Sequence, residues 1–281
     1  MFFFSDAQVD QWLLDDVGLG DLTTRGLGIG SFPGRMIFMF RRDARASGLA
    51  AAAAILRKLG LSVELLHSDG RDVAAGQPLL LAHGSAEALH MGWKVSQNIV
   101  EWASGVADYT ARMLEAGRKE RPGLHVACTR KSIPGTKALA NAAVVHGGGI
   151  LHRGGASETI LLFANHRLFT ETPGDFASHI SRLREAAPEK KIIVEADTVE
   201  EALGVLKASP DVLQLDKFGV DDIGRIVRLA AAECPDCLIS AAGGVNKDNI
   251  AAYAATGVHL VVSSAPYYAK PVDVKVRMEK N

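Results

Sequence analysis

Short apolar runs alternate with longer amphipathic stretches in the second half of the chain. Six apolar runs are typical of buried strands: Leu124–Cys128, Thr159–Ala164, Ile192–Glu195, Val212–Leu215, Leu238–Ala241 and Leu260–Ser263. Helical patterns separate most of them, over residues 136–146, 173–187, 199–207, 220–233 and 246–255. Strands that alternate with helices of about 10–15 residues predict βαβ units and a parallel sheet. We expect an incomplete (β/α) barrel rather than a doubly wound sheet, because no G-x-G-x-x-G motif follows the first strand.

The first part of the chain has a different pattern. Ser5 with Gln8 forms a capping-box pattern that predicts a helix over residues 5–17, and the glycine-rich residues 18–30 are expected to form a loop. The pattern that follows predicts strands over residues 35–42, 61–67 and 79–82, a helix over residues 46–59, and a long helix from Ser85 to about Lys119 with a candidate interruption at Gly105. A small α+β unit therefore precedes the barrel.

Composition and charge narrow the class of protein. The 281 residues are 48% hydrophobic, which is enough for one large barrel or for a barrel with a smaller domain. The formal net charge of −1 argues against a nucleic-acid binder that acts through a bulk positive field, so an anion site must be a local cluster of cations. Met1–Phe4 lacks a basic flank and Ala50–Leu56 is too short to cross a bilayer, so we expect a cytoplasmic location.

Three cysteines are too few for a disulfide framework. Cys234 and Cys237 form a C-x-x-C pattern, but no second pair of ligands accompanies it. We interpret this pattern as a turn between a helix and the next strand, rather than as a zinc or redox site.

Polar residues or glycines follow every predicted strand of the second half. In a parallel barrel the carboxyl ends of the strands meet at one rim, where the loops carry the chemistry. The strand-end sequences are, in chain order, Thr129-Arg130-Lys131, Asn165-His166, Glu195-Ala196-Asp197, Asp216-Lys217, Gly243-Gly244 and Ser263-Ser264. His152-Arg153 lies in the glycine-rich loop of residues 147–155. The sequence therefore predicts a single site at this rim.

The basic residues of the rim are candidates for anion binding. Arg130 and Lys131 precede the turn Pro134-Gly135, and together they offer a planar fork and a point charge to a carboxylate or phosphate. The glycines around His152-Arg153 allow backbone N–H groups to approach an anion closely. The alternatives are a solvated strand end and an ordinary surface loop.

Two carboxylates and a glycine pair complete the candidate site. Glu195 and Asp216 end apolar runs, so each needs either a structural ion pair or a catalytic task. Gly243-Gly244 before a helix, with Ser263-Ser264 after the next strand, resembles the phosphate cup of late barrel strands. This set suits a sugar phosphate that develops positive charge at its anomeric carbon, with the acids stabilising the sugar or holding Mg²⁺.

At these positions the chain resembles the quinolinate phosphoribosyltransferase (nicotinate-nucleotide pyrophosphorylase) family. The resemblance covers nearly the whole chain, in the family's order, and rests on these segments: residues 15–24 (DDVGLGDLTT), 104–107 (SGVA), 129–137 (TRKSIPGTK), 147–153 (GGGILHR), 165–166 (NH), 194–197 (VEAD), 214–216 (QLD) and 242–245 (AGGV).

The resemblance implies a fold, a partner and a reaction. The implied fold is an N-terminal open-faced α/β sandwich over residues 20–100 and an incomplete barrel over residues 101–266. The tail of residues 267–281 is a candidate to rejoin the sandwich, and the helix of residues 5–17 is a candidate to pack on the barrel. The implied partner is a second copy of the chain, with active sites shared across a homodimer. The implied reaction transfers phosphoribosyl from phosphoribosyl pyrophosphate, with Mg²⁺, to a pyridine dicarboxylate.

The resemblance also implies roles for residues of the rim. Lys131, Glu195 and Asp216 are expected to be catalytic on the phosphoribosyl side, with Mg²⁺ held through the two acids and the substrate. The remaining candidates form two groups, Gly243, Gly244, Ser263 and Ser264 for the 5′-phosphate, and Arg130, His152 and Arg153 for the acid substrate.

Several positions depart from the family's pattern. Lys94 stands where an arginine reaches into the partner's site, and Phe163 stands where a lysine meets the substrate. Lys217 replaces the usual asparagine, and Ser264 a late-strand glycine. Exchanging a cation for an aromatic ring removes a charge-assisted contact worth about 1.5–3 kcal/mol, which disfavours a dicarboxylate. The altered set resembles the ModD branch of the family, whose members are pyrophosphorylases encoded with molybdenum transport.

Four hypotheses about function follow. The leading one is a ModD-like phosphoribosyltransferase with an acceptor other than quinolinate. The second is quinolinate phosphoribosyltransferase of NAD biosynthesis itself, with Lys94 doing the work of the arginine. The third is a non-catalytic oxyanion-binding protein of molybdate uptake, which the two acids at the rim disfavour. The fourth is a Schiff-base aldolase using Lys131 or Lys217, which needs a desolvated lysine.

Overall fold

The computed structural model describes residues 2–280, which divide into two compact units. We call them the N-terminal unit, made of residues up to 111 with residues 133–148 and those from 266 onward, and the barrel unit, made of residues 112–132 and 149–265. The long helix α4 (Ala86–Glu120) contributes residues to both units. Within the described residues, no helix combines the length and the apolar character that a membrane span requires.

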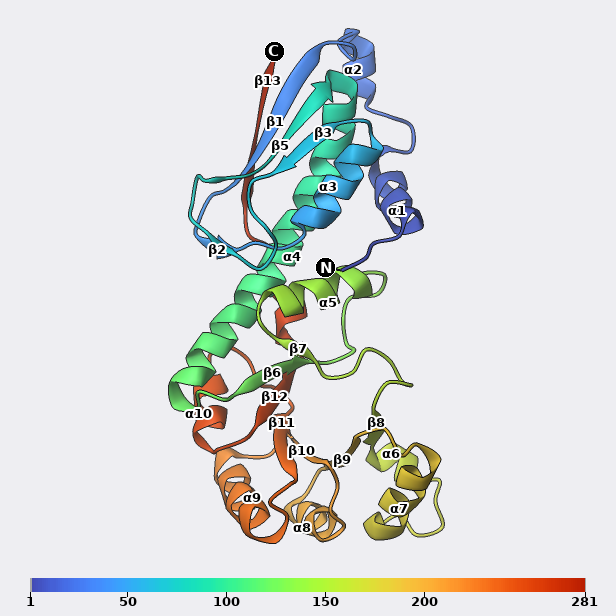
Figure 1. Ribbon diagram of the computed structural model, residues 1–281, viewed down its shortest axis with the longest axis vertical. Helices are drawn as coiled ribbons and strands as arrows, with labels where there is room; N and C mark the ends of the chain where they lie inside the picture. Colours follow the sequence, from blue (N-terminus) through green and yellow to red (C-terminus); the bar gives the residue numbers. More distant parts are fainter. Residues whose placement is uncertain (1, 281) are drawn as a thin grey trace. The chain divides into compact units, whose positions relative to one another are not determined.

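The N-terminal unit is built on a four-stranded antiparallel sheet with helices α3 (Leu49–Lys58) and α4 packed against it (Figure 1). The strand order is β13 (Val274–Lys280), β1 (Pro33–Phe40), β5 (Pro78–Ser85) and β3 (Ser62–Leu65). The core of this unit joins Phe38 of the sheet with Leu56 of α3 and Val100 of α4. The unit therefore has the open-faced α/β arrangement that the resemblance implied.

Other elements of the N-terminal unit are short or peripheral. Helix α1 (Asp6–Val17) packs on α3, with the Asp10 carboxylate 2.6 Å from the Lys58 ammonium nitrogen. The remaining elements are α2 (Leu22–Leu27), α5 (Lys137–His146), the 3-10 turn η1 (Ala265–Tyr268), and the paired strands β2 (Ala44–Arg45) and β4 (Asp72–Val73).

Two expectations for this part of the chain were wrong. The glycine-rich residues 18–30 are not all loop, because Asp21 accepts a hydrogen bond from the backbone N–H of Thr24 and caps helix α2. Gly105 does not interrupt the long helix, which runs unbroken from Ala86 to Glu120. A Cβ at Gly105 would lie 2.6 Å from the carbonyl oxygen of Lys270, so this glycine allows a close approach of the C-terminal segment.

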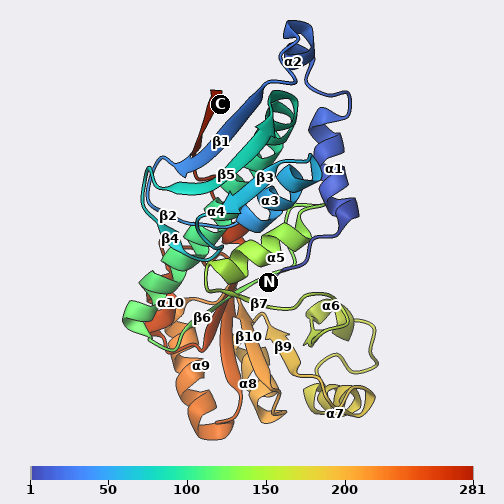
Figure 2. The same ribbon diagram turned by 45° about the horizontal axis from the view of Figure 1, so that its top comes forward.

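The barrel unit is an incomplete barrel, as the sequence predicted. Its sheet has seven parallel strands in the order β7 (Ile150–Leu151), β6 (His125–Cys128), β12 (Leu260–Ser263), β11 (Leu238–Ala242), β10 (Val212–Asp216), β9 (Ile192–Ala196) and β8 (Ile160–Leu162). Figure 2 shows the curled sheet with α8 (Val199–Lys207) and α9 (Val220–Glu233) lying alongside it. The helices α6 (Ala164–Arg167), α7 (Phe176–Ala186) and α10 (Ile250–Ala255) complete the unit.

The six predicted strands of this unit are present, with two short elements added. Strand β7 lies inside the predicted glycine-rich loop, and the four-residue helix α6 follows β8 directly. The C-x-x-C pattern is the predicted turn, because Cys234 ends α9 and its carbonyl accepts a hydrogen bond from the N–H of Cys237. Cys128, Cys234 and Cys237 are all free and buried.

Candidate active site

All predicted site residues except Lys94 belong to the barrel unit, where they lie at the carboxyl ends of its strands. Because every strand pair in this sheet is parallel, these ends share one rim. The rim therefore gathers residues that lie far apart in the sequence.

The two acids come from neighbouring strands and share one face of the sheet. Glu195 in β9 is paired in register with Gln214 in β10, and Asp216 lies two residues further along β10. The amide nitrogen of Gln214 donates a hydrogen bond of 2.6 Å to the Glu195 carboxylate. Burial raises the pKa of Glu195 and the charge of Asp216 adds to this effect, while the hydrogen bond from Gln214 opposes it. The two carboxylates therefore act on each other.

Gln214 is a site residue that the sequence reasoning missed. It is buried, and its side-chain oxygen has no hydrogen-bond partner among the described residues. Its signal in the sequence is periodicity, since residues two apart in a strand point to the same face and Gln214 thus shares the face of Asp216. Its amide orients the Glu195 carboxylate from below the rim.

The glycine pair forms a tight turn after β11. Gly243 and Gly244 have φ angles of 86° and 81°, a left-handed conformation that favours glycine. A Cβ at Gly243 would lie 2.7 Å from the backbone nitrogen of Lys217 and 3.0 Å from a carboxylate oxygen of Asp216. The lack of a side chain at Gly243 therefore lets the glycine turn lie directly against Asp216.

The two serines after β12 differ in what they offer a ligand. The Ser263 hydroxyl is buried, donates a 2.5 Å hydrogen bond to the carbonyl of Val245 and accepts one from the N–H of Ala265. It holds the glycine turn against β12 from within the protein. Ser264 is half-buried and follows directly.

The cationic side of the rim is built from the ends of β6 and β7. The backbone N–H of His152 donates to the carbonyl of Cys128, which places His152-Arg153 next to Arg130 at the end of β6. Burial lowers the pKa of Arg153, and the charge of Arg130 lowers it further, while that of Glu195 raises it. Arg130 and Lys131 themselves are exposed. Arg153 therefore lies close enough to both Arg130 and Glu195 for their charges to act on it.

His152 is neutral at pH 7. Burial, followed by the nearby charge of Arg153, lowers its pKa from 6.5 to about 4. Its Nε2 atom is buried and has no hydrogen-bond partner among the described residues. A neutral imidazole offers a ligand a single directional hydrogen bond and no charge.

Phe163 lies between the cationic residues and helix α6. The guanidinium carbon of Arg153 lies 5.5 Å from the centroid of the Phe163 ring. The centroid of the His166 ring lies 5.6 Å from that of Phe163, and His166 Nδ1 accepts a hydrogen bond from the backbone N–H of Phe163. The ring also packs against the buried side chains of Leu161 and Ile193.

Arg167, the last residue of helix α6, anchors this helix to α7 and α8, and the sequence did not single it out. The Arg167 guanidinium is buried, lies 2.9 Å from the Glu201 carboxylate and stacks over the ring of Phe176. No motif marked Arg167, because its partners come from α7 and α8.

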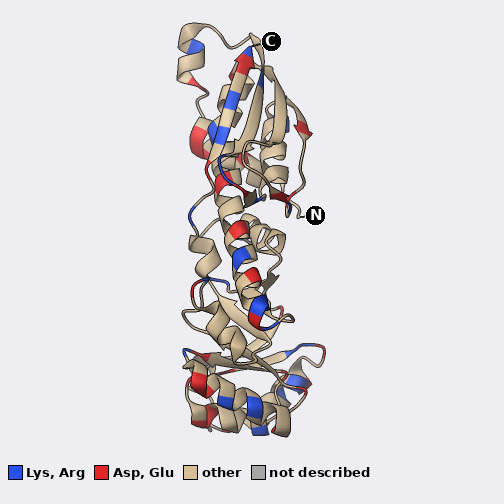
Figure 3. Ribbon diagram, turned by 90° about the vertical axis from the view of Figure 1, so that its left-hand side faces the viewer, with Lys and Arg blue, Asp and Glu red and all other residues tan. Residues whose placement is uncertain are grey.

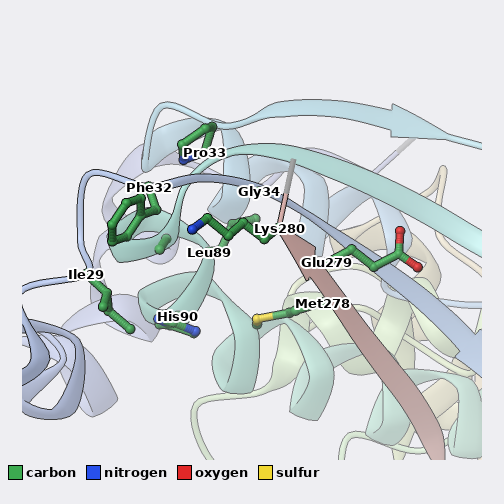
Figure 4. Close-up of a pocket in the computed structure, with 10 residues that line it drawn as sticks. Ile29, Phe32, Pro33, Gly34, Leu89, His90, Met278, Glu279 and Lys280 are labelled. Atoms are coloured by element: carbon green, nitrogen blue, oxygen red, sulfur yellow. The ribbon is translucent and has the colours of Figure 1, made fainter.

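Lys94 belongs to the N-terminal unit. It lies on α4, with its ammonium 4.3 Å from the centroid of the Trp93 ring and hydrogen-bonded to Gln97. The same unit has an apolar cavity of about 310 Å³, lined by residues such as Phe32, Leu89 and Met278 (Figure 4). This cavity contains none of the predicted site residues.

Charge elsewhere is mixed in sign. Figure 3 shows Lys and Arg interspersed with Asp and Glu over the ribbons of both units. The cluster of cations at the rim is therefore a local feature, which agrees with the formal net charge of −1.

The donor set at the acidic side fits a magnesium ion that arrives with a phosphorylated substrate. Mg²⁺ is commonly held by one or two carboxylates, while phosphate oxygens and waters complete its octahedron. Glu195 and Asp216 supply two such carboxylates, and within residues 2–280 no cluster of three or more potential metal ligands forms a dedicated site.

A half-barrel whose rim carries acids, cations and a glycine turn, joined to an antiparallel-sheet unit, defines an α/β-barrel enzyme. The chain belongs to the quinolinate phosphoribosyl transferase family, whose N-terminal domain model matches residues 21–104 and whose C-terminal domain model matches residues 106–277. The family resemblance noted in the sequence is thereby confirmed.

Relatives place the chain near the ModD branch. It is 48% identical over 279 residues to the pyrophosphorylase ModD of Escherichia coli O6:H1 strain CFT073, and the match covers 99% of this chain and 98% of the relative. It is 45% identical over 280 residues to ModD of Pasteurella multocida, covering 100% and 99%. A nicotinate-nucleotide pyrophosphorylase (carboxylating) of Synechocystis is 30% identical over 280 residues, covering 98% and 93%.

The fold agrees with solved structures of the family. The nicotinate-nucleotide pyrophosphorylase of Francisella tularensis superposes with a TM-score of 0.89 over 97% of this chain and 95% of that chain, at 22% identity. This likeness concerns the fold alone.

Proposed function

We propose that this chain is a ModD-like pyrophosphorylase that transfers the phosphoribosyl group of phosphoribosyl pyrophosphate to an acceptor other than quinolinate. The observation that carries the proposal is the placement of Glu195 and Asp216 at the ends of adjacent strands, with Gly243 packed directly against Asp216. Family membership supports the reaction class, and the ModD relatives support the branch.

The acids and the cations stabilise the opposite charges that develop as the bond between the sugar and pyrophosphate breaks. As the bond from the anomeric carbon to pyrophosphate breaks, positive charge develops on the sugar, and the carboxylates of Glu195 and Asp216 stabilise it. Negative charge develops on the leaving pyrophosphate, and the exposed ammonium of Lys131 offsets it. The N–H groups of the turn at Gly243 and Gly244, together with Ser264, bind the 5′-phosphate.

Magnesium is part of this proposal. Glu195 and Asp216 would hold the ion, which would supply positive charge next to the pyrophosphate.

The acceptor side supports an altered substrate. Arg153 offers a cation that lies over the Phe163 ring, and neutral His152 offers a hydrogen bond through a buried Nε2 that has no partner among the described residues. An aromatic ring can stack on Phe163, but the position supplies no charge for a second carboxylate. This side therefore fits a ring that carries fewer charges than quinolinate.

Turnover assays decide between the two phosphoribosyltransferase hypotheses. With phosphoribosyl pyrophosphate and Mg²⁺, we expect slow or no turnover of quinolinate and faster pyrophosphate release with an aromatic monocarboxylate. Robust formation of nicotinate mononucleotide and CO₂ from quinolinate would establish the alternative, in which Lys94 serves as the substrate cation.

Two further hypotheses are tested by binding and trapping. Calorimetry is expected to show that phosphoribosyl pyrophosphate binds with Mg²⁺, whereas binding of molybdate without it would favour an oxyanion-binding protein of molybdate uptake. A Schiff-base aldolase is disfavoured because the Lys217 side chain is 80% exposed and ion-paired and Lys131 is exposed, so neither is desolvated. Borohydride trapping without a covalent adduct would agree with this.

We also propose a cytoplasmic homodimer in which Lys94 of one copy contributes to the site of the other. Mixing a Lys94→Ala variant with a Glu195→Gln variant tests this arrangement. If sites are shared, each mixed dimer regains one intact site, so activity rises above that of either variant alone. Activity that stays at the level of the separate variants would argue for sites complete within one copy.

A further inference from the structure

Lys217 adopts a backbone conformation that lysine rarely takes. Its φ angle is 59°, in the left-handed region, and among the described non-glycine residues only Ser209 shares this sign. Asparagine and glycine tolerate this region best. The backbone N–H of Lys217 donates a 2.9 Å hydrogen bond to the carbonyl of Ala242, which fixes the turn to the neighbouring strand. The fold therefore holds Lys217 in a strained conformation at the rim.

This conformation brings the Lys217 ammonium to the acids. Its nitrogen lies 3.2 Å from a carboxylate oxygen of Asp216, while the side chain stays 80% exposed. The charges of Asp216, Asp197 and Glu195 all act on this ammonium. The Lys217 ammonium thus lies in the field of the two acids that would hold a metal bound with the substrate.

We propose that Lys217 is a built-in cation of the acidic rim, which takes over part of the charge that Mg²⁺ otherwise supplies to phosphoribosyl pyrophosphate. This inference rests on the proposed function and deepens it. In the ligand-free protein the ammonium neutralises Asp216 and repels a divalent ion. When phosphoribosyl pyrophosphate binds, the exposed ammonium can turn from Asp216 to its anionic oxygens.

If Lys217 and Asp216 were an ordinary surface ion pair, replacing Lys217 would not change the affinity for a metal ion or for phosphoribosyl pyrophosphate. Lys191 and Asp211 form such a pair at the opposite end of the same two strands, where Lys191 precedes β9, Asp211 precedes β10 and the two charges lie 2.9 Å apart. Exposed pairs contribute little to stability, so a pair of this kind gives no reason to hold Lys217 in the left-handed region. The Lys191–Asp211 pair is therefore a matched control.

The first test measures metal binding to the full-length protein without substrate. Lys217→Asn removes the charge and suits the left-handed backbone, and Lys217→Gly is a second variant that also relieves strain. Calorimetry with Mn²⁺ is expected to show binding about tenfold tighter in both variants than in the wild type, because a repelling charge near the two acids is gone. Lys191→Asn should leave Mn²⁺ affinity unchanged. Equal affinity in all four proteins would overturn the inference.

The second test measures binding of phosphoribosyl pyrophosphate with a chelator and with saturating Mg²⁺. In the chelator, Lys217→Asn is expected to bind about tenfold more weakly than the wild type, and the gap should narrow with Mg²⁺. A gap of the same size in both conditions, or no gap, would show that Lys217 does not stand in for the metal. If the wild type fails to bind phosphoribosyl pyrophosphate even with Mg²⁺, the proposed function fails, and the Mn²⁺ measurement alone decides the role of the Lys217 charge.

Discussion

The guanidinium of Arg153 lies 5.5 Å from the ring centroid of Phe163, although the two residues follow the opposite edge strands β7 and β8 of the seven-stranded sheet. The curl of the sheet brings these two edges together at the rim. Arg153 lies over the aromatic ring, and its N–H groups are the donors that it can offer a ligand. The acceptor side of the site is therefore shaped by this pair.

Phe163→Lys is expected to improve the use of quinolinate. A lysine at this position adds a charge-assisted contact worth about 1.5–3 kcal/mol, which corresponds to a gain of about 10- to 150-fold in kcat/KM for the dicarboxylate. Steady-state assays of quinolinate turnover with phosphoribosyl pyrophosphate and Mg²⁺ measure this gain. Phe163→Leu is the control, because it removes the ring without adding a charge, and it should not improve quinolinate turnover. Equal effects of the two variants would show that Phe163 does not set charge selectivity.

The strands of the barrel unit were predictable because their apolar runs end at polar residues, as at Glu195 and Asp216. The short elements were not, since β7 has two residues and α6 has four, too few to show a period. Strand β13 carried a usable signal in the alternation of Val274, Val276 and Met278, and it pairs with β1. The contact of Arg153 with Phe163 could not be predicted, because it depends on how far the sheet curls.

Gly243→Ala is expected to destabilise the protein more than Gly244→Ala. Both glycines have left-handed φ angles, so each substitution costs roughly 1–2 kcal/mol of strain. Only at Gly243 would the new Cβ meet backbone, 2.7 Å from the nitrogen of Lys217, whereas nothing lies within 4 Å of a Cβ at Gly244. Thermal unfolding of the two variants measures the difference. A similar loss in both would mean that Lys217 and its loop move away without cost.

His152 is expected to make the folded protein sensitive to acid. Its pKa is about 4 when folded, compared with 6.5 for an ordinary histidine, so the unfolded chain takes up a proton first as the pH falls. The stability that His152 contributes is therefore complete above about pH 6.5 and is lost progressively towards pH 4, by at most about 3 kcal/mol. Urea unfolding across this range should show a smaller loss in His152→Gln than in the wild type. His125→Gln, at the exposed start of β6, is the matched control, and a loss in it like that of His152→Gln would contradict the assignment.

Glu195→Gln is expected to abolish most of the activity while making the protein more stable at neutral pH. The pKa of Glu195 is raised in the folded state, mainly by burial, so folding favours its protonated form and ionisation at higher pH costs stability. A glutamine removes this cost and still accepts the hydrogen bond from Gln214, so the melting temperature of the variant should exceed that of the wild type near pH 7 and match it at low pH.

The same change at Glu195 removes the charge that stabilises the sugar cation, so kcat should fall far more than the affinity for phosphoribosyl pyrophosphate. Asp216→Asn should show the same split between kcat and affinity. Unchanged turnover in both variants would mean that the two acids are structural and that the chemistry lies elsewhere on the rim.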